Sequence, residues 1–312
     1  MNMQYTTLGR TELKVSVVGL GCGGHSRLGT AQGKSMAHGE TIVRRALELG
    51  VNFIDTAAAY GTEPAVGEVI KGQRDGVVIS TKAGIGHSGQ LLSATQVQAS
   101  LENSLHSLGT EYIDVFNLHG VTLDEYDHAI DNILPMLERQ KVAGKIRYLG
   151  VTEAFIRDPA HDMLQRALVD DLFDVIMVGF NLINPSARHT VFPLTVKNNV
   201  ATQIMFAVRR ALSQPVALAE MVRELVQQGI VTGIDLADPL KFVRDDSQVE
   251  SIVHAAYRFC RHEPGATVVL TGTGSADHLQ SNVDSILSPR LPDEVLMGLE
   301  KYFGKVDSVS GN

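Results

Sequence analysis

The chain has 312 residues, 44% hydrophobic and 20% charged, which is the composition of a globular protein with a large core. Its formal net charge of −8, with no basic run longer than an arginine pair, argues against nucleic acid or an anionic membrane as a partner. The chain lacks a signal-peptide core, a stretch near the roughly 18 apolar residues of a membrane span, and any CxxC spacing, so we expect a cytoplasmic protein without disulfides or zinc.

Strand and helix patterns alternate along the chain after a short N-terminal hairpin. Residues 4–7 and 12–15 flank a Leu-Gly-Arg-Thr turn and are expected to form a small lid. The strands that follow are predicted at residues 15–21, 51–55, 77–81, 113–118, 146–151, 174–180, 200–206 and 267–271. Helices are predicted at residues 36–49, 63–71, 94–108, 126–142, 159–168, 186–198, 276–287 and 292–303.

Eight apolar strands, each followed by a helix, predict a parallel sheet covered by helices and closed into a (β/α)8 TIM barrel. The last two strands are separated by a long insertion, residues 207–265, with helices expected near 216–228 and 247–262. No internal repeat, low-complexity tract or linker interrupts the pattern, so we predict one domain over residues 1–312. The last helix is expected to pack on the base of the barrel.

Four side chains with acid–base chemistry lie at the ends of three successive predicted strands. Asp55 ends the second barrel strand, Lys82 follows the third, His119 follows the fourth, and Tyr60 lies five residues past Asp55. In such a barrel the carboxyl ends of the strands carry the chemistry, so these side chains are expected to meet at the barrel mouth.

The four residue types are complementary. A lysine cation near Tyr60 would stabilise the phenolate and lower a pKa that is ordinarily near 10. Asp55 would supply the counter-charge that a buried Lys82 requires. His119 would orient a carbonyl or relay a proton.

These motifs resemble the aldo-keto reductase family over nearly the whole chain. The resemblance begins at LGRTELKVSVVGLGCGG, continues through NFIDTAAAYGTEPAVGEVI, VVISTKAG, YIDVFNLHG and GKIRYLGVTE, and ends at VLTGTGSADHLQSNV. The family's catalytic tetrad falls on Asp55, Tyr60, Lys82 and His119. The resemblance implies an NADP- or NAD-dependent interconversion of a small aldehyde, ketone or sugar lactol with its alcohol or lactone, with Tyr60 as general acid or base.

The resemblance also implies where the adenosine half of the cofactor binds. The matching segment follows the eighth strand and comprises Gly272, Thr273, Gly274, Ser275, His278 and Asn282. Backbone amides at a helix N-terminus suit a phosphate. His278 is expected near the ribose and Asn282 near adenine. Residues 272–282 contain no Lys or Arg, which favours NAD, although NADP remains open.

The nicotinamide side departs from the family pattern. Thr152 and Glu153 stand where a Ser-Asn pair usually holds the carboxamide, and Met177 stands where a Gln is common. Glu153 is expected either to accept a hydrogen bond from the carboxamide or to weaken cofactor binding. Phe206 is the candidate to stack on the nicotinamide, and Gly21 would let the first loop pass close to it.

Several other interpretations of the sequence stay open. After Phe206 the usual Pro-Leu is replaced by AVRRALS, whose Arg209–Arg210 pair would be solvated or would contact a cofactor phosphate or an acidic substrate. The second candidate function is a nicotinamide-binding regulatory protein with little turnover. A third is a barrel isomerase or a Schiff-base enzyme using Lys82, which ranks low because a Schiff-base lysine must be neutral.

Two further motifs carry less weight. GLGCGG at 19–24 satisfies the G-x-G-x-x-G pattern but runs into a polar loop rather than a helix, which argues against a Rossmann site. The histidines lack metal-ligand spacing, so no metal is expected. The expected partner is a small molecule, and the sequence does not determine its identity, the reaction direction or the oligomeric state.

Overall fold

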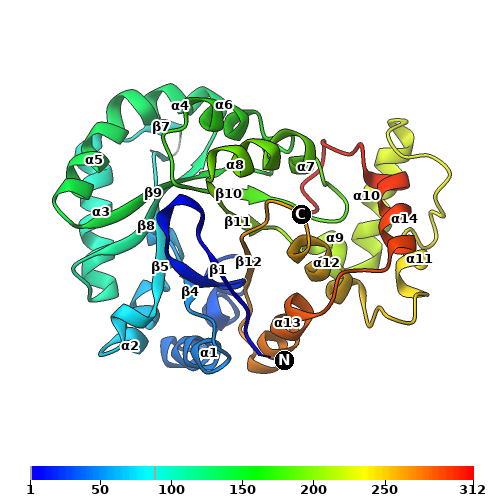
Figure 1. Ribbon diagram of the computed structural model, residues 1–312, viewed down its shortest axis with the longest axis horizontal. Coiled ribbons are helices and arrows are strands. Elements are labelled where there is room, and N and C mark those ends of the chain that lie inside the picture. Colours follow the sequence, from blue (N-terminus) through cyan, green and yellow to red (C-terminus); the bar gives the residue numbers. More distant parts are fainter. Residues whose placement is uncertain (1, 88) are drawn as a thin grey trace.

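A closed barrel of eight parallel strands dominates the computed structural model, which describes residues 2–87 and 89–312 (Figure 1). Each strand pairs with the barrel strand before it in the sequence, and the last strand pairs with the first. The strands are β3 (Val18–Gly21), β4 (Phe53–Asp55), β5 (Val78–Gly84), β8 (Ile113–Val121), β9 (Ile146–Glu153), β10 (Val175–Gly179), β11 (Ala201–Met205) and β12 (Val268–Thr271). The predicted (β/α)8 barrel is confirmed, whereas the single domain over 1–312 stays a prediction.

Helices connect the strands on the outside of the barrel. They are α1 (Met36–Glu48), α2 (Glu63–Ile70), α3 (Ala94–Leu108), α4 (Leu123–His128), α5 (Leu134–Val142), α6 (Asp162–Asp170), α7 (Ala187–Thr190), α8 (Phe192–Asn198), α9 (Arg210–Ser213), α10 (Pro215–Gln227), α11 (Lys241–Arg244), α12 (Ile252–Arg261), α13 (Ala276–Leu287) and α14 (Asp293–Phe303). Local signals set several of these ends. Ser93 caps α3 through a capping box, and Gly109 ends it at a φ of +61°.

The helix predicted at 126–142 begins earlier than expected. Thr122 and Glu125 form a capping box in which the Glu125 carboxylate accepts from the Thr122 backbone N–H at 3.1 Å. The helix therefore starts at Leu123, and a π-helical segment at Ala129–Ile133 joins α4 to α5.

The helix predicted at 186–198 is broken into α7 and α8. Pro193 lies in the first turn of α8, where its missing N–H costs no hydrogen bond. The long insertion between β11 and β12 is confirmed, and α10 and α12 correspond to its two predicted helices. The short helices α9 and α11 and a small hairpin, β6 (Gly86–His87) with β7 (Gln90–Leu91), were not predicted.

The N-terminal hairpin closes the base of the barrel. It consists of β1 (Tyr5–Thr7) and β2 (Lys14–Ser16), and it inserts the fully buried Leu8 and Val15 into an apolar layer. The barrel side chains of this layer are Phe53, Val78, Val115, Val175, Ala201 and Val268. The prediction that the last helix packs on the base was wrong, because the hairpin occupies it. Instead α14 packs beside α11, with the rings of Phe242 and Tyr302 5.6 Å apart.

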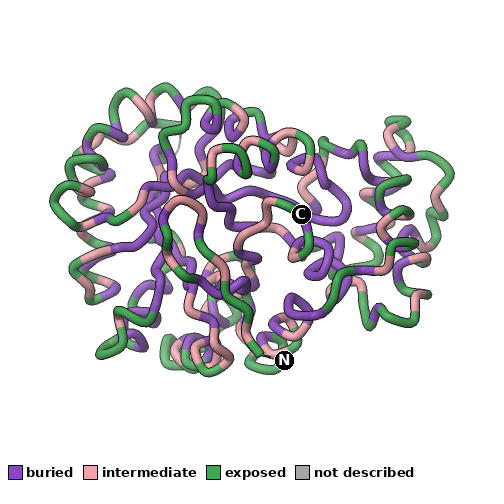
Figure 2. The backbone as a smooth tube through the Cα atoms, in the orientation of Figure 1, coloured by how far each residue is buried: buried purple, intermediate pink, exposed green. Residues whose placement is uncertain are grey.

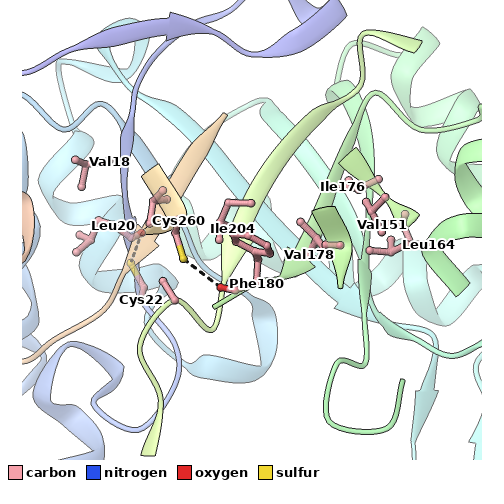
Figure 3. Packing of buried hydrophobic residues seen from close by; sticks show 14 of the residues in the cluster. Val18, Leu20, Cys22, Val151, Leu164, Ile176, Val178, Phe180, Ile204 and Cys260 are labelled. Atoms are coloured by element: carbon pink, nitrogen blue, oxygen red, sulfur yellow. Dashed lines mark hydrogen bonds between the residues drawn. The ribbon is translucent and has the colours of Figure 1, made fainter. Parts of the chain in front are cut away.

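Side chains alternate between the barrel interior and the helical layer. Figure 3 shows outward residues such as Ile176, Val178 and Ile204 packed in this layer with Leu164 of α6 and Cys260 of α12. The barrel strands are mostly buried, whereas the part of the insertion that lies beside the barrel with α14 is a mixture of buried and exposed residues (Figure 2). Because side chains along a strand alternate with a period of two, the residue two positions past each barrel-strand member of this apolar layer also points inward, toward the mouth.

The C-terminal segment returns to the barrel after α14. Gly311 accepts a hydrogen bond at its carbonyl from Ala211 N–H at 3.1 Å, and Asn181 donates to the Ser310 carbonyl at 3.2 Å. Residues just past β10 and β11 are therefore held next to the chain end (Figure 1). Within the described ranges, no helix combines the length and apolar content of a membrane span.

Candidate active site

An Asp–Lys ion pair lies inside the barrel, where β4 and β5 run side by side. Lys82 Nζ donates to both oxygens of Asp55, at 2.7 and 2.8 Å, and to the Thr56 carbonyl at 2.7 Å. Lys82 is 1% exposed and Asp55 4%, so water screens neither charge. Burial opposes the ammonium charge, but the Asp55 carboxylate together with smaller contributions, Tyr60 first among them, outweighs burial and raises the pKa of Lys82. Lys82 is thus held as a cation, which disfavours its use as a Schiff-base nucleophile.

Tyr60 and His119 complete the group above this ion pair. Tyr60 Oη lies 3.5 Å from His119 Nε2, and their rings meet edge to face at 5.7 Å. Lys82 Nζ lies 5.3 Å from the centre of the Tyr60 ring. Asp55 ends β4 as predicted, but β5 and β8 continue past Lys82 and His119, so both lie within strands rather than after them.

Burial decides the protonation of the phenol and the imidazole. The Lys82 cation lowers the pKa of Tyr60 as expected, but desolvation by burial is the larger effect and raises that pKa overall. Burial, helped by the Lys82 charge, lowers the pKa of His119 to about 3. Near neutral pH the site therefore presents a protonated phenol beside a neutral imidazole. Such a pair can give a proton to a carbonyl oxygen and orient it by a hydrogen bond.

A polar cluster beneath the ion pair was missed by the sequence analysis. Ser80 donates to Asp55 Oδ1 at 3.1 Å and accepts from Asn117 Nδ2 at 3.0 Å and Gln203 Nε2 at 3.1 Å. Ser80 and Asn117 each lie two residues before a member of the tetrad, so counting back along the strands would have placed them inside the barrel. The two amides polarise the hydroxyl toward Asp55 and help to fix its carboxylate.

The pair Thr152–Glu153 is split by strand alternation. Thr152 points inward, and its Oγ1 accepts from Gly120 N–H at 2.7 Å. Glu153 points outward, where its carboxylate accepts from Gly179 N–H at 2.6 Å and contacts His161 Nδ1 at 2.9 Å. Its side chain is fully buried, so this arrangement gives it a role in joining β9, β10 and the loop before α6. The carboxylate does not face the barrel interior.

Met177 faces the interior next to two polar side chains. It is the register partner of Thr152 on β9 and of Gln203 on β11, and all three point inward. An amide is therefore present in the layer where the family usually has its Gln, but it comes from the neighbouring strand and is hydrogen-bonded to Ser80.

Phe206 follows β11 in a strained conformation. Its φ is +63°, in the left-handed region that a bulky residue rarely adopts. Its ring meets Phe155 edge to face at 5.4 Å, and Phe155 in turn stacks on His161 at 5.3 Å. On the Phe206 ring lies the Arg209 guanidinium, 3.8 Å from the ring centre. The aromatic ring is thus supported from one side and covered by a cation.

The segment after β12 lies against the first loop of the barrel. A Cβ built on Gly272 would lie 2.8 Å from the Gly21 carbonyl, and one built on Gly274 would lie 2.6 Å from Gly29 Cα. Gly21 is in turn the register partner of Asp55, which places the first loop between the ion pair and this segment. Only glycine permits so close an approach, which brings backbone groups of the two loops together.

The start of α13 is built from short local hydrogen bonds. Ser275 caps the helix by accepting from His278 N–H at 3.4 Å, and Thr273 Oγ1 accepts from Ser275 N–H at 3.1 Å. His278 is exposed, and Asn282 donates to Thr271 Oγ1 at 2.8 Å. A helix N-terminus beside exposed Gly272 is a donor set that fits a phosphate group.

Neither cysteine lies in a reactive environment, and no metal centre is found among the described residues. Cys22 and Cys260 are buried free thiols, and burial raises the pKa of both. In residues 2–87 and 89–312, no three His, Cys, Asp or Glu side chains are grouped in a way that could hold a metal ion.

Comparisons with known proteins agree with this geometry. A model of the Aldo/keto reductase family matches residues 19–302. The chain is 26% identical to the uncharacterized oxidoreductase YqkF of Bacillus subtilis, over 96% of each sequence, and 34% identical to the L-galactose dehydrogenase of Arabidopsis thaliana over 48% of each. Its fold is similar to that of the aldo-keto reductase AKR11C1 from Bacillus halodurans in its holo form, with a TM-score of 0.73, 24% identity and 96% of each chain covered.

Proposed function

We propose, from the premise that this chain belongs to the aldo/keto reductase family, that it interconverts a small aldehyde, ketone or sugar lactol with its alcohol or lactone. Family membership makes it an NAD(P)-dependent oxidoreductase. The observation that carries the proposal is the meeting of Asp55, Tyr60, Lys82 and His119 at one mouth of the barrel. The match to an L-galactose dehydrogenase supports the sugar branch of the proposal.

The residues present fit a nicotinamide dinucleotide. Inward Thr152 supplies a hydroxyl on the nicotinamide side, Phe206 supplies an aromatic face, and the α13 N-terminus with Gly272 supplies donors for phosphate. When bound, this cofactor supplies or accepts the hydride exchanged with the substrate carbon.

The side chains of this protein would manage the proton. Tyr60, protonated because burial raises its pKa, gives its phenolic proton to the carbonyl oxygen during reduction. The Lys82 cation stabilises the phenolate that forms, and Asp55 keeps that cation in place. His119, neutral in its buried position, donates a hydrogen bond to the same carbonyl oxygen. In the oxidative direction the phenolate takes the proton back.

The preferred cofactor within this proposal is NAD. Residues 272–282, the segment expected to hold the adenosine half, contain no Lys or Arg that could pair with a 2′-phosphate, and Asp277 lies in the first turn of α13. We therefore expect tighter binding of NADH than of NADPH.

The proposal is tested by nicotinamide absorbance over a panel of carbonyl compounds and sugars, with Tyr60→Phe beside the wild type. Loss of the general acid is expected to lower the rate by about 10²- to 10⁴-fold. Tyr302→Phe, in α14 and far from the tetrad, is the matched control and should keep the wild-type rate. A Tyr60→Phe enzyme with full activity would overturn the role of Tyr60.

The alternative function, a cofactor-binding regulatory protein with little turnover, predicts tight NADH binding without activity on any member of the panel. One reason for this alternative function was that Glu153 would disturb the nicotinamide site. Glu153 points outward and contacts His161 and Gly179, so this reason no longer applies. Titration of NADH by its own fluorescence distinguishes the two functions.

A further inference from the structure

Arg209 brings a guanidinium to the barrel mouth without a polar partner. In residues 2–87 and 89–312 it makes neither an ion pair nor a side-chain hydrogen bond, and its guanidinium lies over the Phe206 ring. Two other arginines of the described chain that are partly or fully buried have polar partners. Arg188 pairs with Glu263 and Glu300, and Arg258 donates to three backbone carbonyls.

The surroundings of Arg209 connect the two halves of the site. A Cβ built on Gly24 of the first loop would lie 3.6 Å from Arg209 Nη1. Burial lowers the pKa of Arg209, and the two groups close enough to oppose that shift are the phenols of Tyr60 and Tyr257. Tyr257 Oη lies 2.9 Å from Thr271 Oγ1, directly before Gly272. The guanidinium therefore lies between the proton donor Tyr60 and the start of the segment that leads to α13.

An anion is the ligand that this environment favours. No carboxylate opposes the partial desolvation of Arg209, and only the phenols of Tyr60 and Tyr257 act against it. A guanidinium forms paired, charge-assisted hydrogen bonds with phosphate oxygens. Paired, charge-assisted bonds of this kind are stronger than one cation–π contact at a partly buried site, so a phosphate would draw Arg209 away from Phe206.

We propose that Arg209 binds the diphosphate of the nicotinamide dinucleotide and exchanges between that diphosphate and the face of the Phe206 ring. This inference rests on the proposed function, because it takes the dinucleotide as the ligand. The guanidinium and a planar ring cannot share the same face of Phe206. Binding of the diphosphate would therefore clear this face for an aromatic group.

The test compares binding of NADH with binding of reduced nicotinamide riboside, which has no phosphate, each followed by its own fluorescence. Arg209→Met should weaken NADH binding by about 10- to 100-fold, because paired bonds to a charged group are lost. The same variant should bind the riboside as well as the wild type does, or more tightly. Arg209→Lys should be intermediate for NADH, because lysine keeps the charge but not the paired geometry.

Arg210→Met is the matched control, since Arg210 is the exposed neighbour of Arg209, and it should bind both ligands as the wild type does. Unchanged NADH binding in Arg209→Met would overturn the proposal. Equal losses of affinity for NADH and for the riboside would also overturn the proposal, because Arg209 would then affect only the shape of the barrel mouth and not the binding of phosphate. A wild-type protein that binds neither ligand would instead refute the proposed function itself.

Discussion

The two sides of the barrel mouth are organised differently. On the β4–β5–β8 side, Lys82 donates three hydrogen bonds. Ser80, which lies below the ion pair, is held by hydrogen bonds with Asp55, Asn117 and Gln203. On the β9–β12 side, Phe206 is strained, and the Arg209 guanidinium lies over its ring without an ion pair or a side-chain hydrogen bond in the described chain. Proton transfer requires charges that are in place before the reaction, whereas a cofactor must enter and leave. We infer that the first side is preorganised and that the second adjusts to its ligand.

Among substitutions that test this difference between the two sides, the largest effect on stability and activity is expected at Lys82. Lys82→Met leaves the Asp55 carboxylate buried without its cation, which should lower the free energy of unfolding by about 3–5 kcal/mol and remove most activity. Adding Asp55→Asn should restore much of the stability but not the activity. Urea denaturation and steady-state rates measure both. A single variant as stable as the wild type would show that the ion pair is not what fixes this side.

The polar cluster under the ion pair should have the next largest effect. Ser80→Ala removes the hydroxyl that receives Gln203 Nε2, leaving a buried donor without a partner at a cost of about 1–3 kcal/mol. Asp55 also loses one of its donors, so turnover should fall while NADH affinity stays constant. The measurement is denaturation together with fluorescence titration of NADH. Weaker NADH binding at constant turnover would assign Ser80 to the cofactor side instead.

His119 should give the first side a dependence on pH. Its pKa in the folded chain is about 3, below the ordinary value near 6.5, so the unfolded chain binds more protons between these values. Stability should therefore fall as the pH drops below 6.5, by roughly 2 kcal/mol at pH 5 from this group. His119→Asn should lack that part of the decline. His278→Asn, at an exposed histidine, is the control and should retain it.

The smallest expected effect lies on the second side, at Glu153. Glu153→Gln keeps an acceptor for Gly179 N–H but loses the charge opposite His161, which should cost about 1–2 kcal/mol of stability. Because the side chain points away from the interior, the Kd for NADH should not change. Thermal melting and NADH titration check the two statements. If the free energy of NADH binding fell by more than the free energy of unfolding, Glu153 would be assigned to the cofactor site instead.

Some features of the site could be read from the sequence because they depend on local order along the chain. Apolar strands with a period of two, separated by amphipathic helices, determine a barrel, and barrel topology makes consecutive strands neighbours. Asp55, Lys82 and His119 were therefore expected together. The same period could have identified Ser80 and Asn117, each two residues before a tetrad member, and it fixes the opposite directions of Thr152 and Glu153.

Other features were decided only by the tertiary structure, because they sum contributions from segments far apart in the chain. Tyr60 lies near a cation, yet its pKa is raised because residues from several loops exclude water from it. The Arg209–Phe206 contact depends on a left-handed residue at the end of β11, which no sequence pattern announced. The last helix packs beside the insertion because the N-terminal hairpin already fills the base of the barrel. Local periodicity thus determined which residues face the interior, and long-range packing determined which of them are charged, strained or without a partner in the described chain.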